Sequence, residues 1–486
     1  MRGQRIKGGR GIVAACLALW LASCATGQTG MLGPAPLAEA PRVTGLTRQA
    51  DRDHAKLVAA FGGEYRAPPL KAFLSEVAAR IVPATERPDE AYQITILNSP
   101  VVNAFALPSG RLYVTRGLLA LANDPAEVAA VLAHEVAHVA LRHASARLEL
   151  EARSALVSRV VADVLGDPSA GAMVRDQSRY RIASFSRAQE LEADQVGVKT
   201  LAKAGYDPYG AARFLSALGR TANLKSAPGS RADAASPDML STHPGTSERV
   251  ALALQAARRI GAPGLVASDR TRYLTAMDGL AFGDDPADGA VRGQRFVHPR
   301  LGVALEAPEG IALENTPRAV LGSSADGNRR FLFDAVEASE EQSLAEVLRS
   351  TWSDAVETGS LENTDVNGRP AAIATSRGKE WTFRLAAIRV GSTTYRLVLA
   401  ARSGLLENEQ AFRHVLDSVR QVSTEEVRSL RPLRVQIVIA LEGDTAERLA
   451  RRMAVPDRPV DRFLVLNGLE RASVLTPGER YKVIVE

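Results

Sequence analysis

The sequence of 486 residues has few cysteines and, beyond its first residues, no long hydrophobic run. Its two cysteines are Cys16 and Cys24, so disulfides cannot form the framework of the fold, and each domain has to rely on its own apolar core. No uninterrupted apolar run of 18 residues follows residue 21, so the body of the chain offers no candidate for a membrane-spanning helix. Apolar residues make up 46% and charged residues 24% of the sequence, which is typical of a folded globular protein.

The chain also lacks a strong excess of charge of one sign. Its 60 Lys and Arg residues face 55 Asp and Glu residues, which gives a net charge of +5. Four of the basic residues, Arg2, Arg5, Lys7 and Arg10, lie in the first ten positions. If that segment is removed, 56 basic residues remain against 55 acidic ones. The sequence therefore gives no electrostatic basis for binding nucleic acid.

The first residues have the layout of a signal peptide. A basic stretch up to Arg10 precedes the apolar run Gly11–Leu21, which is too short to span a bilayer as a helix of about 20 residues. The following Leu21-Ala22-Ser23-Cys24 resembles the bacterial lipobox, in which the signal is cut before a cysteine that receives lipid. An ordinary secretory signal with a stray cysteine is the alternative. By resemblance to the sorting rule for lipoproteins, Ala25 in place of Asp favours the outer membrane.

The length predicts about three domains at roughly 150 residues each, in a multidomain α+β protein. Hydrophobic periodicity predicts a mainly helical first domain, then alternating strands broken by two helices, and finally a short βααβ pattern. The middle pattern loosely resembles the PsbP/Mog1-like sandwich, so we expect an α/β sandwich there. The expected divisions are a signal peptide at 1–23, a tether at 24–50, the helical domain at 51–262, a linker at 263–293, the α/β domain at 294–422 and the βααβ module at 433–486.

One helix start is unusually clear. Asp124 can be the N-cap, Pro125 occupies the first helical position, where its missing N–H costs nothing, and Glu127 follows as in a capping box. The helix continues through His134 to His138. Four residues turn a helix by about 400°, so these two histidines lie one turn apart on one face.

This spacing is typical of a zinc site. Two imidazoles on one face can bind the same zinc ion at about 2.0–2.1 Å, and Glu135 lies about 100° round the helix, where it can act as a general base. A chance HExxH is expected on the order of 0.01 times in a chain with so few histidines. The alternative is a pair of ordinary buried histidines on an alanine-rich helix.

A catalytic zinc needs a third protein ligand. His143 is near, but continuing the helix places it about 140° away from His138, on another face, which favours a solvated histidine or one that supports a ligand. Glu190 and Asp194 are four residues apart, hence on one face, so the first can bind metal while the second supports a zinc histidine. Glu192 points about 200° away from Glu190. Either glutamate could be the ligand, but only Glu190 has an acidic partner on its face; a solvated acidic cluster is the alternative.

Together these motifs resemble the CAAX-prenyl-endopeptidase-like zinc metallopeptidases, and in particular their soluble periplasmic lipoprotein branch. The resemblance covers about residues 51–257. It is carried, in order, by the run Asn103–Gly110 through Thr115–Leu118, the HExxH at His134, the E-x-x-x-D at Glu190, and Ser241-Thr242-His243-Pro244.

The resemblance implies a gluzincin-like fold and one Zn²⁺ per chain. The ligands would be His134, His138 and Glu190. Glu135 would be the general base, and Asp194 would hydrogen-bond the outer nitrogen of a histidine ligand. The stretch Asn103, Ala104, Phe105 and Ala106 would bind extended substrate as an edge strand, a mode that accepts many sequences.

The resemblance also implies a role for His243. It would be a displaceable fourth ligand that keeps the enzyme latent, or it would stabilise the tetrahedral intermediate; Arg249 could fill the second role instead. The alternative is that His243 only caps a loop. Because the body of the chain has no transmembrane helix, prenylated proteins are unsuitable substrates.

The C-terminal residues resemble a lysin motif, the peptidoglycan-binding βααβ module. The resemblance is carried by Gly443-Asp444-Thr445, Leu464–Leu469 and Leu475–Gly478. The alternative is a module that kept the fold without binding glycan. In the α/β domain His298 and His414 are isolated, and no catalytic constellation is evident.

Two functions follow from these patterns. The first is a zinc endopeptidase, lipid-anchored in the periplasm by Cys24 alone, that degrades unfolded or misassembled envelope proteins. The second is a scaffold or chaperone-like lipoprotein with a latent site, which binds peptidoglycan or an outer-membrane assembly machine.

Overall fold

The computed structural model describes two compact units, Met1–Arg52 and Asp53–Glu486. The described residues are 44–143, 186–226, 239, 243, 247–264, 266, 268–316, 319–352, 357, 359–402, 408–455 and 457–486. The expected signal peptide, the lipidation site Cys24 and most of the expected tether lie outside them. No helix among these residues is both long enough and apolar enough to cross a membrane.

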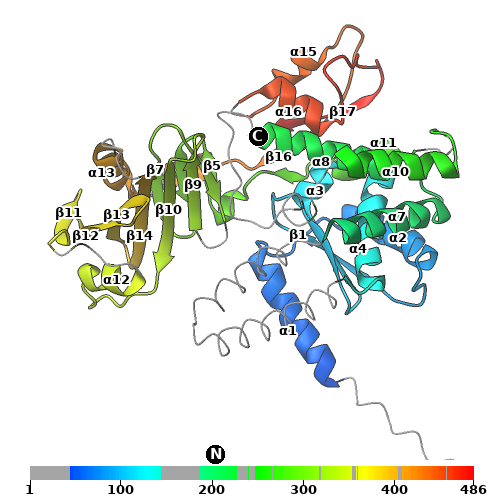
Figure 1. Ribbon diagram of the computed structural model, residues 1–486. Helices are drawn as coiled ribbons and strands as arrows, with labels where there is room; N and C mark the ends of the chain where they lie inside the picture. The colour runs from blue at the N-terminus through cyan, green and yellow to red at the C-terminus, as the bar shows by residue number, and fades with distance from the viewer. Residues whose placement is uncertain are drawn as a thin grey trace, which may run out of the picture. The chain divides into compact units, whose positions relative to one another are not determined.

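The first part of the second unit combines helices with one small sheet (Figure 1). The sheet has the order β1-β3-β2, with β1 parallel and β2 antiparallel to β3. Helix α1 (Thr44–Ala60) begins in the first unit. The elements that follow it in this part are α2 (Pro68–Ile81), β1 (Gln93–Leu97), β2 (Ala104–Leu107), β3 (Arg111–Thr115), α3 (Arg116–Leu121), α4 (Pro125–Ala140), α7 (Arg187–Lys203), α8 (Gly210–Ser226) and α10 (Ser247–Ile260).

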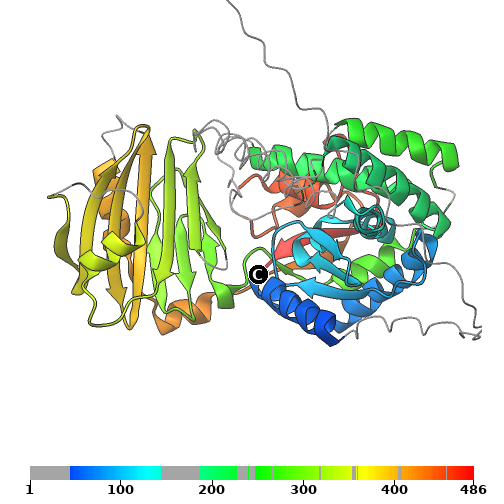
Figure 2. The same cartoon turned by 60° about the horizontal axis from the view of Figure 1, so that its bottom comes forward.

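Helix α4 forms the centre of this part and starts where the sequence predicts. The Asp124 side chain accepts a hydrogen bond from the Glu127 backbone N–H at 3.0 Å, and Pro125 is the first helical residue. The residues from Pro125 to Val139 are all buried, which suits the run of Ala and Val. Helix α7 packs beside α4, as Figures 1 and 2 show. Gly197 lies at this contact, where an added Cβ would be 3.4 Å from the His134 backbone nitrogen, an ordinary van der Waals distance.

Residues 263–293, expected to form a linker, contain regular structure. They include α11 (Arg270–Met277), β4 (Ala281–Phe282), a 3₁₀ turn at Pro286–Asp288 and β5 (Ala290–Arg292). Tyr273, Leu274 and Met277 are fully buried in the same hydrophobic cluster as the residues of α4. Their spacing gives α11 one apolar face. This pattern is hard to recognise in the sequence because the residues around it are polar.

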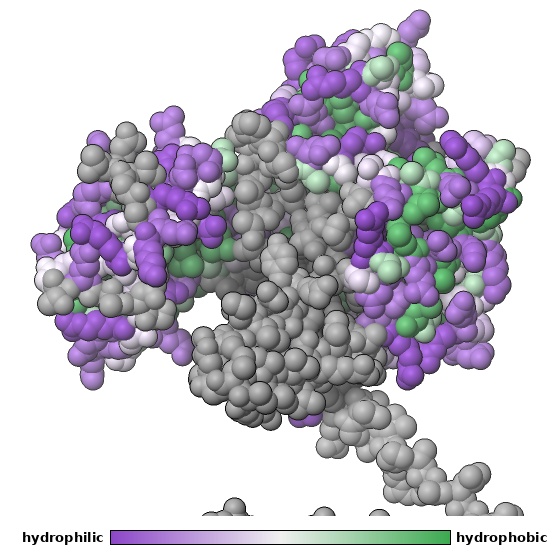
Figure 3. All heavy atoms as spheres, viewed as in Figure 1, coloured by the Kyte–Doolittle hydropathy of each residue, from purple (hydrophilic) through white to green (hydrophobic). Residues whose placement is uncertain are grey.

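The middle of the chain has the sandwich-like layers expected from its alternating pattern. An antiparallel sheet of order β11-β12-β13-β14-β10-β9-β8 and a second sheet of order β15-β7-β6-β5 share one apolar cluster with α13, while α12 packs on the other face of the larger sheet. On the face shown in Figure 3, the described side chains of this region are mostly hydrophilic.

The strands of the larger sheet are β8 (Ile311–Asn315), β9 (Ala319–Ser324), β10 (Arg329–Val336), β11 (Glu362–Val366), β12 (Arg369–Arg377), β13 (Trp381–Val390) and β14 (Thr393–Arg402). The smaller sheet adds β6 (Arg295–His298), β7 (Val303–Glu306) and β15 (Arg420–Gln421) to β5. The two helices are α12 (Leu344–Thr351) and α13 (Asn408–Ser418), and a short helix α14 (Thr424–Ser429) follows.

The C-terminal residues have the βααβ order predicted from the sequence. The elements are β16 (Leu433–Ile439), α15 (Ala446–Ala450), α16 (Pro459–Leu466) and β17 (Arg480–Val485), and β16 pairs with both β17 and β4. Phe463 and Val483 belong to the hydrophobic cluster that also contains the residues of α4. This module therefore shares a core with the helical part of the chain.

Candidate metal centre

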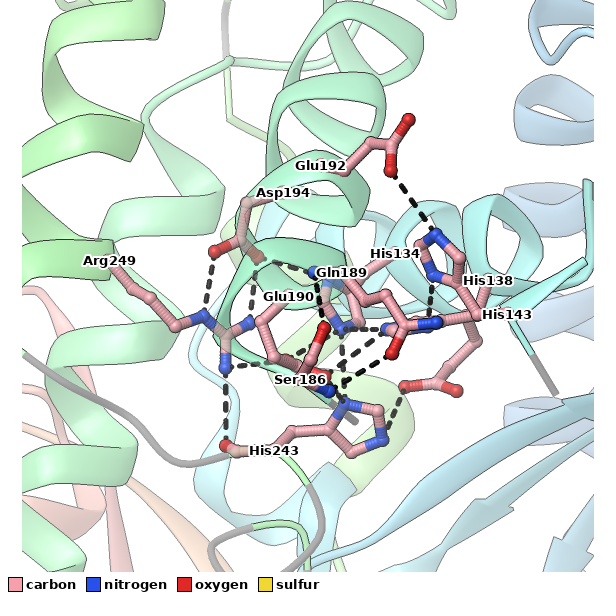
Figure 4. Close-up of polar contacts among 11 residues, drawn as sticks. His134, His138, His143, Ser186, Gln189, Glu190, Glu192, Asp194, His243 and Arg249 are labelled. Atoms are coloured by element: carbon pink, nitrogen blue, oxygen red, sulfur yellow. Dashed lines mark hydrogen bonds and ion pairs between the residues drawn. The ribbon is translucent and has the colours of Figure 1, made fainter. Parts of the chain in front are cut away.

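Three side chains predicted to bind metal converge between α4 and α7 (Figure 4). The Nε2 atoms of His134 and His138, one turn apart on α4, are 3.0 Å from each other. Glu190 reaches them from the first turn of α7, with Oε2 3.5 Å from His134 Nε2 and Oε1 3.5 Å from His138 Nε2. All three residues are buried.

His243 supplies a fourth donor atom to the same cluster. Its Nδ1 lies 2.8 Å from Glu190 Oε1 and 3.3 Å from His134 Nε2. Its backbone N–H donates to the Met239 carbonyl at 2.8 Å, and the Met239 N–H donates to the carbonyl of Val102, just before β2. Of the loop motif around His243, Ser241, Thr242 and Pro244 lie outside the described residues.

The spacing of these four donors fits a zinc ion. Donors arranged tetrahedrally at about 2.0–2.1 Å from one ion are separated by about 3.3 Å. The separations given above range from 2.8 to 3.5 Å. Imidazole nitrogens with one carboxylate oxygen are also a donor set that zinc prefers.

The charges around the donors favour a cation as well. Burial by itself lowers the pKa of His134, but the carboxylates of Asp194 and Glu190 outweigh it and raise that pKa to about 9. Three buried or nearly buried carboxylates, those of Glu135, Glu190 and Asp194, surround the histidines. The cluster therefore attracts positive charge, as a metal site must.

Glu135 lies beside the donors on the same helix. Its Oε1 is 3.8 Å from His243 Nε2, so the ring of His243 stands between Glu135 and Glu190. The side chain is buried, and burial raises the pKa of its carboxyl above the ordinary value. A carboxylate with a raised pKa beside a metal site is suited to take up a proton.

Asp194 and Arg249 support the donors from behind. Asp194 Oδ1 is 3.0 Å from His134 Nδ1, the ring nitrogen that faces away from the cluster. Arg249, on α10, donates from Nε and Nη2 to the two oxygens of Asp194, at 2.7 and 2.8 Å. Burial would raise the pKa of Asp194, but these hydrogen bonds and that of His134 lower it, so the carboxylate stays charged.

Arg249 also contacts Glu190 and the loop residue His243. Its Nη1 is 2.9 Å from Glu190 Oε2 and donates to the His243 carbonyl at 3.2 Å. These contacts make the guanidinium a clamp on two carboxylates and a loop. The alternative role for Arg249, stabilising the tetrahedral intermediate in place of His243, stays a prediction.

The stretch expected to bind substrate forms an edge of the small sheet. Ala104 to Ala106 lie in β2, which pairs on one side with β3, and β2 packs against α4. Ala104 is buried in the cluster of α4, while the ring of Phe105 stacks on Tyr113 with centroids 4.8 Å apart. Asn103, just before the strand, is buried and its N–H donates to Thr115 Oγ1. Among the described residues, β2 leaves its other edge unpaired with any strand.

Two residues near the site, His143 and Glu192, are not among the ligands that the resemblance implies. His143 is buried, and its Nδ1 lies 2.9 Å from His138 Nδ1. Its Nε2 is 3.4 Å from Glu192 Oε2. The expectation that His143 lies on the wrong face fails because α4 ends at Ala140, before this residue. The sequence feature that could have indicated this contact is a histidine five residues after the HExxH motif.

A buried HExxH helix joined by a glutamate from a second helix defines a metallopeptidase-type site. Comparison with known families agrees, since residues 68–257 match Peptidase family M48. This segment is therefore similar to the metallopeptidases of that family.

The chain is also similar to several curated proteins. It is 34% identical over 166 residues to the mitochondrial metalloendopeptidase OMA1 of Arabidopsis thaliana, which covers 34% of this chain and 32% of that protein. It is 27% identical over 288 residues to the beta-barrel assembly-enhancing protease of Escherichia coli (strain K12), covering 54% of this chain and 57% of that protein. With OMA1 of Schizosaccharomyces pombe the identity is 27%, over 37% of this chain and 51% of that protein. The chain thus spans about a third to somewhat over half of these relatives.

Proposed function

We propose that the protein is a zinc-dependent endopeptidase that hydrolyses peptide bonds of cell-envelope proteins. The observation that carries this proposal is the convergence of His134, His138 and Glu190 from two helices, with donor separations of 3.0 to 3.5 Å. Glu135 lies beside them on α4. The match to Peptidase family M48 supports the same reaction class.

The chain's own residues divide the work of hydrolysis. When bound, a zinc ion polarises a carbonyl and lowers the pKa of a coordinated water to about 7. Glu135 takes a proton from the attacking water and returns it to the leaving amine. Asp194 holds the ring of His134, and Arg249 holds Asp194 and Glu190. The edge of β2 that faces away from β3 aligns the substrate by main-chain hydrogen bonds.

The substrates that we propose are unfolded or misassembled proteins of the periplasm and outer membrane. Lipid on Cys24 would anchor the enzyme at the outer membrane, as the lipobox-like sequence and Ala25 suggest. A relative named for beta-barrel assembly supports a role in envelope protein quality control. An edge strand that reads main chain suits such varied substrates.

Digestion of an unfolded outer-membrane porin tests the activity. The lipidated chain in detergent, loaded with zinc, is compared with its Glu135→Gln variant. We expect cleavage by the first and a loss of about 10²–10⁴-fold in the variant, because the base is missing while the ligands remain. Equal cleavage by both proteins would contradict the proposal.

One observation favours the second function, a scaffold with a latent site. His243 Nδ1 lies within 2.8 Å of Glu190 Oε1 and so takes a fourth donor position, which a catalytic site keeps open. The His243→Ala variant distinguishes the endopeptidase from the scaffold. If the variant cleaves the porin faster than the wild type, the protein is an enzyme and His243 is a displaceable inhibitory ligand. If neither protein cleaves any unfolded substrate, the scaffold function is favoured.

We further propose that the βααβ module binds peptidoglycan. Two of its exposed apolar side chains, Leu441 and Val474, lie in the loops that follow β16 and precede β17. Co-sedimentation with purified sacculi tests this. We expect the chain to pellet with sacculi and the double variant Leu441→Ser, Val474→Ser to remain in solution. Equal pelleting of both would contradict glycan binding through these loops. A wild-type chain that stays in solution would leave an outer-membrane assembly machine as the proposed partner.

A further inference from the structure

We propose that His143 and Glu192 are positioning residues that fix the ring of His138 at the metal site. The two residues form a chain of contacts, from Glu192 Oε2 to His143 Nε2 at 3.4 Å and from His143 Nδ1 to His138 Nδ1 at 2.9 Å (Figure 4). The inference rests on the proposed function, because it takes His138 as a ligand.

The end of α4 brings His143 back toward His138. The helix stops at Ala140, Leu141 is the C-cap, and Arg142 adopts a left-handed backbone conformation with φ of 58°. Non-glycine residues rarely adopt this conformation, and it persists where surrounding contacts require it, often at functional sites. The turn carries His143 off the helical path that would have placed it on another face. A continued helix could not make this contact.

The positions of the protons define what each ring does. The Nε2 of His138 faces the other donors, so when that atom binds a metal the ring carries its proton on Nδ1. That proton needs an acceptor, and Nδ1 of His143 lies 2.9 Å from His138 Nδ1. In this contact His143 accepts at Nδ1 and carries its own proton on Nε2, which points at the Glu192 carboxylate. Glu192 thus selects the tautomer of His143, and His143 selects that of His138.

The other histidine ligand has the same kind of support in a shorter form. His134 Nδ1 lies 3.0 Å from Asp194 Oδ1, a direct contact with a carboxylate. For His138, an imidazole stands between ligand and carboxylate. Helix α7 supplies the metal ligand Glu190 and both supporting carboxylates from alternate positions along little more than one turn. The arrangement explains the presence of Glu192, which points away from the other two acids.

The burial of the two side chains predicts which of them contributes more to metal affinity. The His143 side chain is only 5% exposed, whereas that of Glu192 is 57% exposed. Removing His143 leaves the buried Nδ1 proton of His138 without this acceptor, while water can replace part of the Glu192 contact. The loss of His143 should therefore have the larger effect.

Zinc affinity tests the proposal, with the full chain and a chelator competing for the ion. Alteration of a residue that supports a ligand typically costs 10–100-fold in metal affinity. We expect a loss in this range for His143→Ala and a smaller loss for Glu192→Gln. His143→Asn should recover most of the affinity, because an amide oxygen can take the place of Nδ1. Gln195→Ala, an exposed change on the same helix, is the matched control and should bind like the wild type.

The absorption spectrum of the cobalt-substituted protein provides a second readout that reports the geometry of the ligands. We expect a changed spectrum for His143→Ala and a wild-type spectrum for His143→Asn. Wild-type affinity and spectrum in both His143→Ala and Glu192→Gln would overturn the proposal. It would also be overturned if His143→Asn were as weak as His143→Ala while Glu192→Gln bound normally, since His143 would then only fill space.

Two further measurements separate other causes of failure. If circular dichroism of the metal-free protein shows that His143→Ala does not fold, His143→Asn and Glu192→Gln decide the question: wild-type binding by Glu192→Gln then overturns the relay. If the wild type binds no zinc, or His134→Ala binds it equally tightly, the proposed function fails instead.

Discussion

The ammonium group of Lys482 lies 2.6 Å from the carbonyl oxygen of Ala120, although the two residues are 362 positions apart. Lys482 is fully buried, and it also donates to the carbonyl of Ala122 at 2.8 Å. These carbonyls lie at the end of α3, where a helix leaves its acceptors unpaired. Asp124, the N-cap of α4, follows at once. A residue of the last strand thereby supports the segment that starts the helix bearing His134 and His138.

Replacing Lys482 tests whether the C-terminal module is part of the catalytic core. Lys482→Met keeps the length of the side chain but leaves two or more buried carbonyls unpaired, at about 1–3 kcal/mol each. We expect the free energy of unfolding to fall by about that amount, with a single transition in urea. Lys379→Met, an exposed change in the middle region, serves as control. Unchanged stability in Lys482→Met would mean that the module folds apart from the helical domain.

Glu127 gives the stability a pH dependence. Burial, with a contribution from Asp124, raises the pKa of this carboxyl from 4.5 to about 7. The folded state therefore holds its proton more tightly than the unfolded state, so the contribution is complete below pH 4.5 and is lost as the pH rises to about 7. Glu127→Gln cannot lose a proton. We expect a flatter stability profile for the variant between pH 4.5 and 7, measured by urea unfolding; parallel profiles would refute this.

Arg249 offers a test of the clamp on the metal ligands. We expect Arg249→Ala to weaken zinc affinity by about 10–100-fold, because Asp194 and Glu190 lose the cation that orients them. Arg187→Ala is the matched control. It breaks an exposed pair between the same two helices, Arg187 with Glu248. Exposed pairs contribute little, so the control should bind zinc normally. Similar losses in both variants would show that packing of α7 on α10 matters rather than the clamp.

Removal of the metal should lower the thermal stability. An ion held by residues of both α4 and α7 binds only the folded state and so stabilises it. We expect a chelator to lower the midpoint of thermal unfolding and zinc to restore it, as followed by calorimetry. The same treatment of His134→Ala should change little. If the chelator left the midpoint of the wild type unchanged, no ion would link the helices.

The sequence predicted local features well because short-range chemistry determines them. Asp124-Pro125 marks the start of α4, and the four-residue spacing of Glu190 and Asp194 places both on one face of α7. Strands β10, β13, β14, β16 and β17 lie in the two segments where the alternating pattern and the βααβ pattern predict strands.

Features that depend on single backbone angles or on distant packing could not be predicted. The position of His143 follows from the left-handed conformation of Arg142, which its residue type does not favour. The fold of α11 within residues 263–293 depends on contacts with α2 and β16, far away in the sequence. The clamp of Arg249 on Asp194 likewise depends on how α10 packs against α7.

The central claim is that one divalent ion joins two histidines of α4 to a glutamate of α7. Metal analysis of the purified wild type beside Glu190→Ala tests it most directly, with Gln195→Ala as the control on the same helix. The account predicts one zinc per chain in the wild type and the control, and a loss of zinc on dialysis in Glu190→Ala. Equal zinc in all three proteins, at wild-type affinity, would contradict it.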